Sequence, residues 1–142
     1  MADPVEVAIE SALLNRLVAL NLSPALPVQL PNVKFTIPTV GPNVGWLRGT
    51  FLPADSVEIA IAYDGMNQHY GIFQVDVFYG LGGGELAPGR IASAIMGWFP
   101  RGTKLTKDGF TVEIKRLPFR GRLISDDPWI MIPVSITYLA YA

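Results

Sequence analysis

The sequence feature that most constrains the fold is a strict alternation of apolar residues near the C-terminus. A period of two places alternate side chains on one face of a β-strand. The sequence therefore predicts a long strand that is central in a sheet, except near Pro133, which marks an edge position or a bulge because proline has no N–H to donate. The alternating positions are Ile130, Ile132, Val134, Ile136, Tyr138 and Ala140.

Three earlier segments repeat this period of two. Each pairs an apolar face with a more polar one, the pattern of half-buried antiparallel strands. Trp46, Arg48 and Thr50 form the second face of the first segment, and Asp64-Gly65 is predicted to begin a turn after the next one. The apolar positions are Leu47 and Phe51, then Val57, Ile59, Ile61 and Tyr63, and then Phe73, Val75, Val77 and Tyr79.

A hairpin is predicted around Lys107-Asp108-Gly109, because an Asp-Gly pair between two strand-like runs favours a tight turn. The runs are Thr103–Thr106 and Phe110–Leu117, with Phe110, Val112 and Ile114 on the inner face. A polar loop through Arg120, Arg122, Asp126 and Asp127 is expected to lead from this hairpin to the last strand.

The first 20 residues carry helical signals. Asp3, Pro4 and Glu6 resemble a helix start, with a capping carboxylate, a proline in the first turn and a glutamate that reaches back. Apolar residues then recur at spacings of three and four, so a helix is predicted over about 4–20. Prolines recur through the connector 24–42, which must be extended or turning, and only Val33–Ile37 has the character of a short strand there.

A second helix is predicted from Leu86 to Phe99, ended by Pro100. Its polar stripe is narrow, a pattern typical of a helix that is buried on two sides. Its second side is expected to meet either the first helix or another subunit. The polar stripe consists of Arg90, Ser93 and Gly97.

The order helix, strands, helix, strands predicts an α+β fold in which a mostly antiparallel sheet carries two main helices on one face. Residues 1–142 are predicted to form a single domain, with the sheet and the second helix in 45–141. The chain has no cysteine, which excludes thiol catalysis, thiolate zinc sites and iron–sulfur clusters. Half of the residues are hydrophobic and only 16% are charged, which suggests surfaces that partners bury.

Targeting signals are not expected. Asp3, Glu6 and Glu10 stand where a signal peptide requires positive charge. No uncharged stretch reaches the ~20 residues that span a bilayer. We therefore expect a cytoplasmic product with no membrane partner.

Two features resemble enzyme motifs without completing them. His69 is the only histidine, so a hydrolase with an imidazole base would be centred on it, but no Gly-x-Ser-x-Gly motif accompanies it. Gly80–Gly84 lies between a strand and a helix, as in dinucleotide-binding folds, but Glu85 occupies the third glycine position and would repel a pyrophosphate. Asp126 and Asp127 are adjacent and point apart in an extended chain, which disfavours a metal site. No catalytic residue, metal or cofactor is predicted, and a small hydrolase centred on His69 stays the alternative from another class.

Charge is divided unevenly along the chain. Residues 1–95 have four basic and eight acidic groups, whereas residues 96–142 have seven basic and four acidic groups. The basic residues of 96–142 are open to three interpretations: solvation of the surface, pairing with an acidic surface on a neighbouring copy, or contact with DNA phosphates. The candidate subunit or partner interface comprises Arg101, Lys104, Arg116, Arg120 and Arg122, with Ile59 and Tyr63 of the segment Leu52–Tyr70 and Met96 of the second helix.

Four stretches together, in this order, resemble the tail-terminator-like proteins of long-tailed bacteriophages and prophages. The resemblance covers about Trp46 to Tyr141. The stretches are Leu52-Pro53-Ala54-Asp55, the strand from Gly71 to Tyr79, Phe99-Pro100-Arg101-Gly102-Thr103 and Pro133-Val134-Ser135-Ile136.

The resemblance implies a structural role without catalysis or cofactor. Proteins of this family form a ring, typically a hexamer, on the end of the tail tube, stop its polymerisation and present a surface to the head connector. The implied partners are therefore other copies of the chain, the tail-tube protein and the head-connector protein, with DNA passing through the ring without specific binding. The implied location is the virion tail, after assembly in the bacterial cytoplasm. Another small head–tail joining or tail-completion protein stays an alternative.

Overall fold

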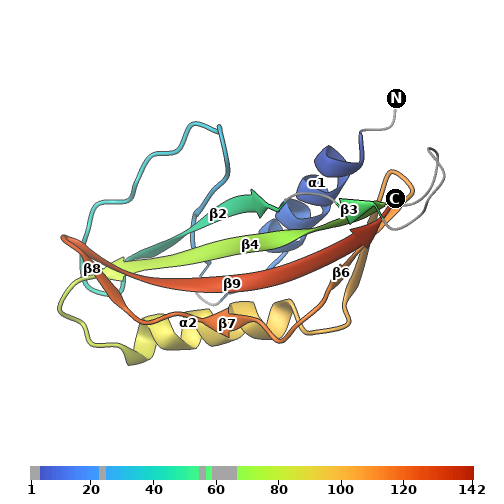
Figure 1. The fold of residues 1–142 in the computed structure, drawn as a ribbon. Helices are drawn as coiled ribbons and strands as arrows, with labels where there is room; N and C mark the ends of the chain where they lie inside the picture. Colours follow the sequence, from blue (N-terminus) through green and yellow to red (C-terminus); the bar gives the residue numbers. More distant parts are fainter. Residues whose placement is uncertain (1–3, 23–24, 55–56, 59–66) are drawn as a thin grey trace.

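The computed structural model describes residues 4–22, 25–54, 57–58 and 67–142, and it has two helices and nine strands in this part of the chain (Figure 1). The predicted helix over 4–20 and the predicted helix from Leu86 to Phe99 are both present, with slightly shorter bounds. The elements are α1 Val5–Val18, β1 Val28–Gln29, β2 Gly45–Pro53, β3 Val57–Glu58, β4 Asn67–Gly80, α2 Leu86–Trp98, β5 Lys104–Lys107, β6 Phe110–Ile114, β7 Phe119–Arg120, β8 Ile124–Asp126 and β9 Trp129–Tyr141.

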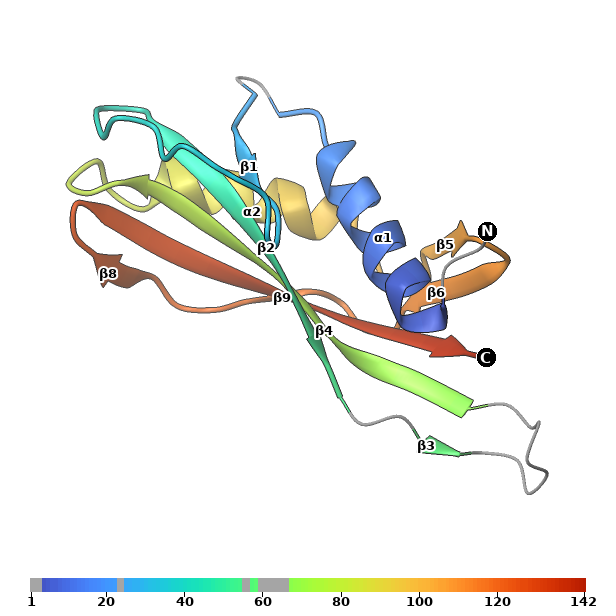
Figure 2. The ribbon, with the colours of Figure 1, turned by 90° about the horizontal axis from the view of Figure 1, so that it is seen from above.

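The strands form one sheet in the order β1-β2-β4-β9-β6-β5. Among the strands of the described residues, the β1–β2 pair is parallel and every other pair is antiparallel. β3 pairs with the first two residues of β4, Asn67 and Gln68. β7 and β8 pair with β9. Both helices lie on the same side of the long strands (Figure 2). The predicted α+β fold is confirmed.

The side of the sheet that carries the helices is called here the inner face. Its residues come from alternate positions of β2, β4, β6 and β9, as the period of two predicts, and they pack against α1 and α2. This single layer between sheet and helices forms the main core. Its fully buried members include Leu13, Leu17, Leu47, Phe73, Val75, Val77, Ile95, Ile114, Ile132, Val134 and Ile136.

The two helices contact each other through a reciprocal pair of residues. Arg16 of α1 donates two hydrogen bonds to the backbone oxygen of Trp98, at 3.0 and 2.8 Å, and Trp98 Nε1 donates to the backbone oxygen of Arg16 at 2.6 Å. The Arg16 guanidinium also lies 3.8 Å from the centre of the Trp98 ring. α2 is thus held by the sheet and by the end of α1. Its remaining side, with Ser93, Ala94 and Gly97, is exposed, so α2 is not buried on two sides within one copy of the chain.

The predicted strand at Val33–Ile37 is wrong, and the connector instead pairs with the sheet at β1. β1 ends because Pro31 has no N–H and Asn32 adopts a left-handed backbone with φ of 53°. The Val33 N–H donates to the Leu30 backbone oxygen at 3.3 Å and closes the turn. This turn keeps Val33–Ile37 from continuing β1 as a strand, and Phe35 instead packs against Trp46 of the sheet.

The predicted loop from Arg120 to Asp127 is wrong in part, because this segment contributes to β7 and β8, which both pair with β9. Between them, the Gly121 N–H donates to the Pro133 backbone oxygen at 2.8 Å. In a strand the N–H and C=O of one residue point the same way, so the N–H that Pro133 lacks would face the gap between β7 and β8. The predicted local edge at Pro133 is confirmed within an otherwise central strand.

The predicted hairpin is confirmed in β5 and β6. Asp108 and Gly109 have φ of 52° and 83°, as a two-residue type I′ turn requires. The described part of the predicted strand from Val57 is β3. Asp3 and the predicted turn at Asp64-Gly65 lie outside the described residues.

Candidate assembly surface

The side of the sheet opposite the helices is called here the outer face, and large hydrophobic side chains are exposed along it. Strand register places Leu52 of β2 opposite Ile72 of β4, and Phe119 opposite Ser135 of β9. A sheet face in contact with water usually carries polar residues, and exposed apolar patches mark binding surfaces. The exposed members of the outer face are Leu52, Tyr70, Ile72, Phe119, Ile124 and Tyr141, with exposed fractions between 37 and 68%.

One end of the outer face is covered by the chain itself. The rings of Trp46 and Phe78 stack 4.0 Å apart, and the Trp129 ring meets Trp46 edge-on at 6.2 Å. Phe35 of the connector packs over this cluster, with its ring 5.4 Å from that of Trp46. The connector therefore covers the aromatic end of the outer face and leaves the rest uncovered.

A buried carboxylate lies in the middle of the outer face. Asp76 is fully buried and accepts two hydrogen bonds from Arg48, from Nε at 3.1 Å and from Nη2 at 2.9 Å. Gln74 Nε2 donates to the other carboxylate oxygen at 2.8 Å. Arg48 also lies over the Phe78 ring at 4.9 Å. Because both oxygens of Asp76 are bound within the chain, this group is structural.

The fold places three of the basic candidate residues beside β6 and separates the other two from them. Arg101 lies beside the end of β6, because the Gly102 N–H donates to the Ile114 backbone oxygen at 2.8 Å. Lys104 lies opposite Glu113 on the same hairpin, and Arg116 follows β6. Arg122 is exposed between β7 and β8.

Arg120 is directed toward α2 instead. Its Nη2 lies 3.7 Å from Glu85 Oε2, and a Cβ at Gly89 would lie 3.1 Å from its Nη1. Met96 is half-buried and packs against the core. Ile59 and Tyr63 lie outside the described residues.

Neither of the two enzyme-like features is part of a complete catalytic site among the described residues. His69 is nearly buried on β4 and lines a cavity of about 280 Å³ with Glu6 and Tyr138. No serine, threonine or cysteine is among the described residues that line this cavity. The loop Gly80–Gly84 leads to Glu85, the residue before α2, and its carboxylate pairs with Arg120. Among the described residues, no group of three or more histidine, aspartate or glutamate side chains is arranged to hold a metal ion.

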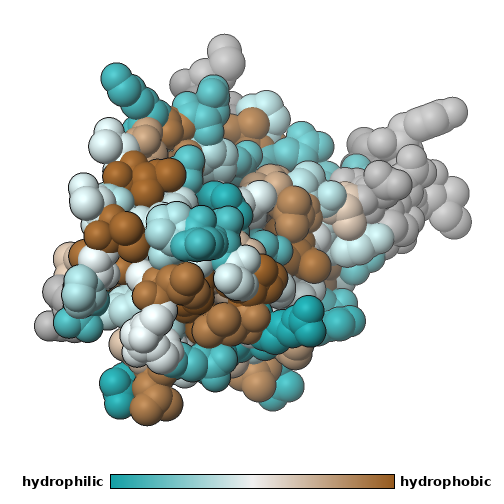
Figure 3. Space-filling model, turned by 90° about the vertical axis from the view of Figure 1, so that its left-hand side faces the viewer, coloured by the Kyte–Doolittle hydropathy of each residue, from teal (hydrophilic) through white to brown (hydrophobic). Residues whose placement is uncertain are grey.

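The end of the molecule at the left of Figure 1 contains the connector, the glycine-rich loop and the turn between β8 and β9. The connector and the glycine-rich loop line a hollow of about 390 Å³ between residues 40–43 and residues 79–83. Figure 3 looks onto this end and shows hydrophobic side chains exposed between hydrophilic ones. Val40 and Leu81, which line the hollow, are exposed. The candidate segment Leu52–Tyr70 includes two residues of the outer face, but the sequence analysis did not single out the rest of that face or this end of the molecule.

Tyr138 gives the fold a dependence on alkaline pH. Burial of its hydroxyl, together with the negative charge of Glu10, raises its pKa from 10.0 to about 12. The unfolded chain therefore loses this proton at lower pH than the folded chain. The stability contributed by protonated Tyr138 is fully present below pH 10 and is lost as the pH rises from 10 to about 12. We expect Tyr138→Phe to remove that part of the alkaline loss, measured by urea unfolding across this pH range. An equal loss in both proteins would contradict the assignment.

Comparison with known proteins finds a family model and a solved structure that are similar to this chain. A family model described as "Phage tail terminator protein" matches residues 8–138. A solved structure is similar to the chain with a TM-score of 0.72 and 29% identity, covering 96% of this chain and 92% of that one. None of the curated proteins matches the sequence. No described helix is both long and apolar enough to cross a membrane.

Proposed function

This chain belongs to the phage tail terminator family, and from that premise we propose that it forms a hexameric ring that caps the tail tube. The ring would end polymerisation of the tube and present a surface to the head connector. Assembly would take place in the host cytoplasm, and DNA would pass through the ring without specific binding. Membership of this family makes the protein a structural component of the phage tail.

The exposure of large hydrophobic side chains on the outer face is the observation that supports this proposal. Six large hydrophobic side chains are exposed on it, whereas the inner face is covered by two helices. A ring with head-to-tail contacts needs two different, complementary patches on each subunit. The second patch would come from another part of the surface; Leu86 at the start of α2 and Leu117 before β7 are each more than 70% exposed.

Charged residues would add direction to these contacts. Arg101, Lys104 and Arg116 lie at the β5–β6 end of the molecule, and Arg122 is exposed at a different place. Paired with acidic groups of a neighbouring copy, they would speed association and exclude wrong partners. Met96 would contribute only if the exposed side of α2 joins the contact. Arg120 is already engaged by Glu85 and is the weakest candidate of the group.

Light scattering over a concentration series, with and without the tail-tube protein, tests the proposal. We expect discrete particles of about six copies, alone or on the tube, and co-purification with the tube protein. A 15.5 kDa monomer that does not bind the tube protein would overturn the proposal. Binding to the head connector but not to the tube would favour a different head–tail joining protein.

A further inference from the structure

One edge of the sheet is left open along half of β2. β1 pairs with β2 only at Leu47 and Arg48, and within the described residues no strand pairs with residues 49–53 on that side. The Leu47 N–H donates toward β1, to the Pro27 backbone oxygen at 2.9 Å. Backbone groups point to the two sides of a strand in alternation, so the N–H and C=O of Phe51 also point to this edge. Pro53 has no N–H to offer, so the template for an added strand is the stretch that precedes it.

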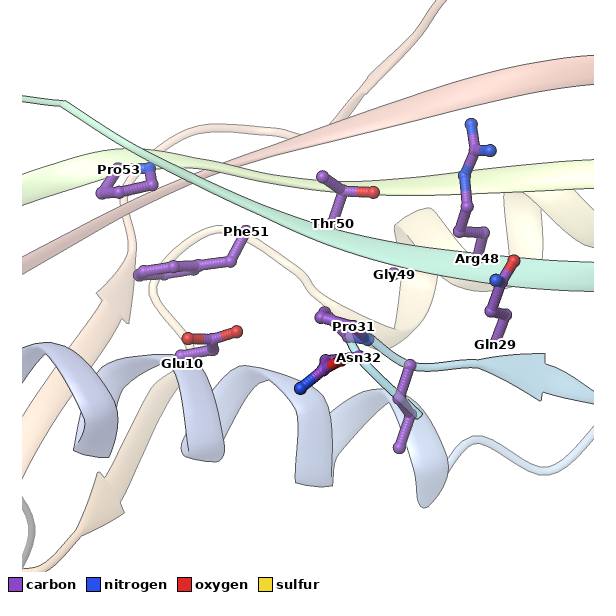
Figure 4. A pocket seen from close by; sticks show the side chains of 10 residues that line it. Glu10, Gln29, Pro31, Asn32, Arg48, Gly49, Thr50, Phe51 and Pro53 are labelled. Atoms are coloured by element: carbon purple, nitrogen blue, oxygen red, sulfur yellow. The ribbon is translucent and has the colours of Figure 1, made fainter. Parts of the chain in front are cut away.

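A groove of about 520 Å³ runs along this open edge and is called here the edge groove (Figure 4). β2 forms one wall through Gly49, Thr50 and Phe51, and α1 forms the other wall with Glu10. Figure 4 shows the Glu10 carboxylate facing the Phe51 ring from across the groove. Pro31 belongs to the turn that closes one end. The edge groove thus combines backbone hydrogen-bonding groups with an apolar surface and one carboxylate.

The same chain contains a strand-like segment that pairs with no strand. Val33–Ile37 is rich in β-branched residues, which favour strands, but the structure gives it no regular secondary structure. Val33 and Ile37 are 55% and 53% exposed, and Lys34 is exposed between them. Phe35 packs against Trp46 of its own chain and fixes the position of the segment. Figure 1 shows this part of the connector in an arch beyond the edge of β2. The turn at Pro31 and Asn32 prevents the segment from continuing β1 along its own edge groove.

We propose that Val33–Ile37 of one copy adds as a strand to the open edge of β2 in a neighbouring copy. This contact rests on the proposed function as a self-assembling ring and specifies one of its interfaces. Lys34 brings a positive charge to a groove that contains Glu10, whereas the other charged residue of the groove, Arg48, is already paired with Asp76. Each copy donates one segment and accepts another, which supplies the two different patches that a head-to-tail ring requires.

The absence of cysteine allows a direct test by cross-linking. One variant carries Ile37→Cys and an affinity tag, and a second, untagged variant carries Leu52→Cys on β2. Adjacent strands lie about 4.8 Å apart, within reach of a short bis-maleimide. We expect a cross-linked dimer of one tagged and one untagged chain when the two variants are assembled together. Thr106→Cys, which is exposed on β5 at the opposite edge of the sheet, replaces Leu52→Cys in the control and should give no such product.

A charge exchange gives a second measurement. Lys34→Glu places like charges together, and we expect it to weaken self-association at least about tenfold. Adding Glu10→Lys in the same chain should restore association, measured by light scattering. If particles of about six copies form but neither the cross-link nor the charge rescue is observed, the strand exchange is wrong while the proposed function stands. Absence of both particles and cross-links overturns both.

Discussion

Replacing Arg48 by alanine is expected to lower the free energy of unfolding by about 3 kcal/mol, because it leaves the buried Asp76 carboxylate without its cation. Asp76 is completely buried and would retain only the hydrogen bond from Gln74. The estimate is at the low end for a broken buried pair because the Arg48 side chain is 41% exposed, so water can reach the vacated position. Urea unfolding at neutral pH measures the change.

Two controls separate the charge from the side-chain volume. Asp76→Asn in the Arg48→Ala background removes the unpaired charge and should recover much of the lost stability. Arg122→Ala removes an exposed arginine and should change the free energy of unfolding by less than about 0.5 kcal/mol. If Arg48→Ala is as mild as Arg122→Ala, the Arg48–Asp76 pair does not stabilise the sheet.

Ile72→Asp is expected to weaken self-association and tube binding about thirtyfold or more. Ile72 lies between Leu52 and Thr137 in the register of the outer face. A carboxylate there would have to lose its water in any contact that covers this face, at a cost of about 2 kcal/mol or more. The side chain is 38% exposed in the single chain, so we expect the variant to fold. Light scattering and pull-down with the tube protein measure the effect.

The matched control is Val7→Asp. Val7 is exposed to a similar degree on α1, away from the outer face. It should retain assembly if the outer face is the contact. Equal loss in both variants would point to a general effect of added negative charge, and assembly by Ile72→Asp at the normal concentration would exclude the outer face from the interface.

Long periodic elements were predictable from the sequence because each repeats one pattern over many residues. The alternation of Ile130 to Ala140 indicated β9, and the predicted polar and apolar faces of β2 and β4 are the outer and inner faces of the sheet. Short elements were not predictable. β7 and β8 have two and three residues, and they exist because β9 offers them a ladder, which no local pattern reports.

The candidate surface was harder to predict than the fold. Arg120 has the charge of an interface residue, but the return of the chain past α2 brings it to Glu85. The Arg48–Asp76 pair joins residues 28 positions apart and depends on the register of β2 against β4. A signal for the outer face was present: Leu52, Tyr70 and Ile72 stand at positions of β2 and β4 where a solvated face would carry polar residues.

The two faces of β9 share one strand, and this limits how the protein can change during evolution. Even-numbered residues from Ile130 to Ala140 point into the core, and odd-numbered residues point to the outer face. A single-residue insertion or deletion within the strand would exchange these roles for every residue beyond it. Substitutions at the odd positions from Ser135 to Leu139, by contrast, leave the main core untouched. The outer face can therefore follow a changing partner by replacement of residues, while the length of β9 stays fixed.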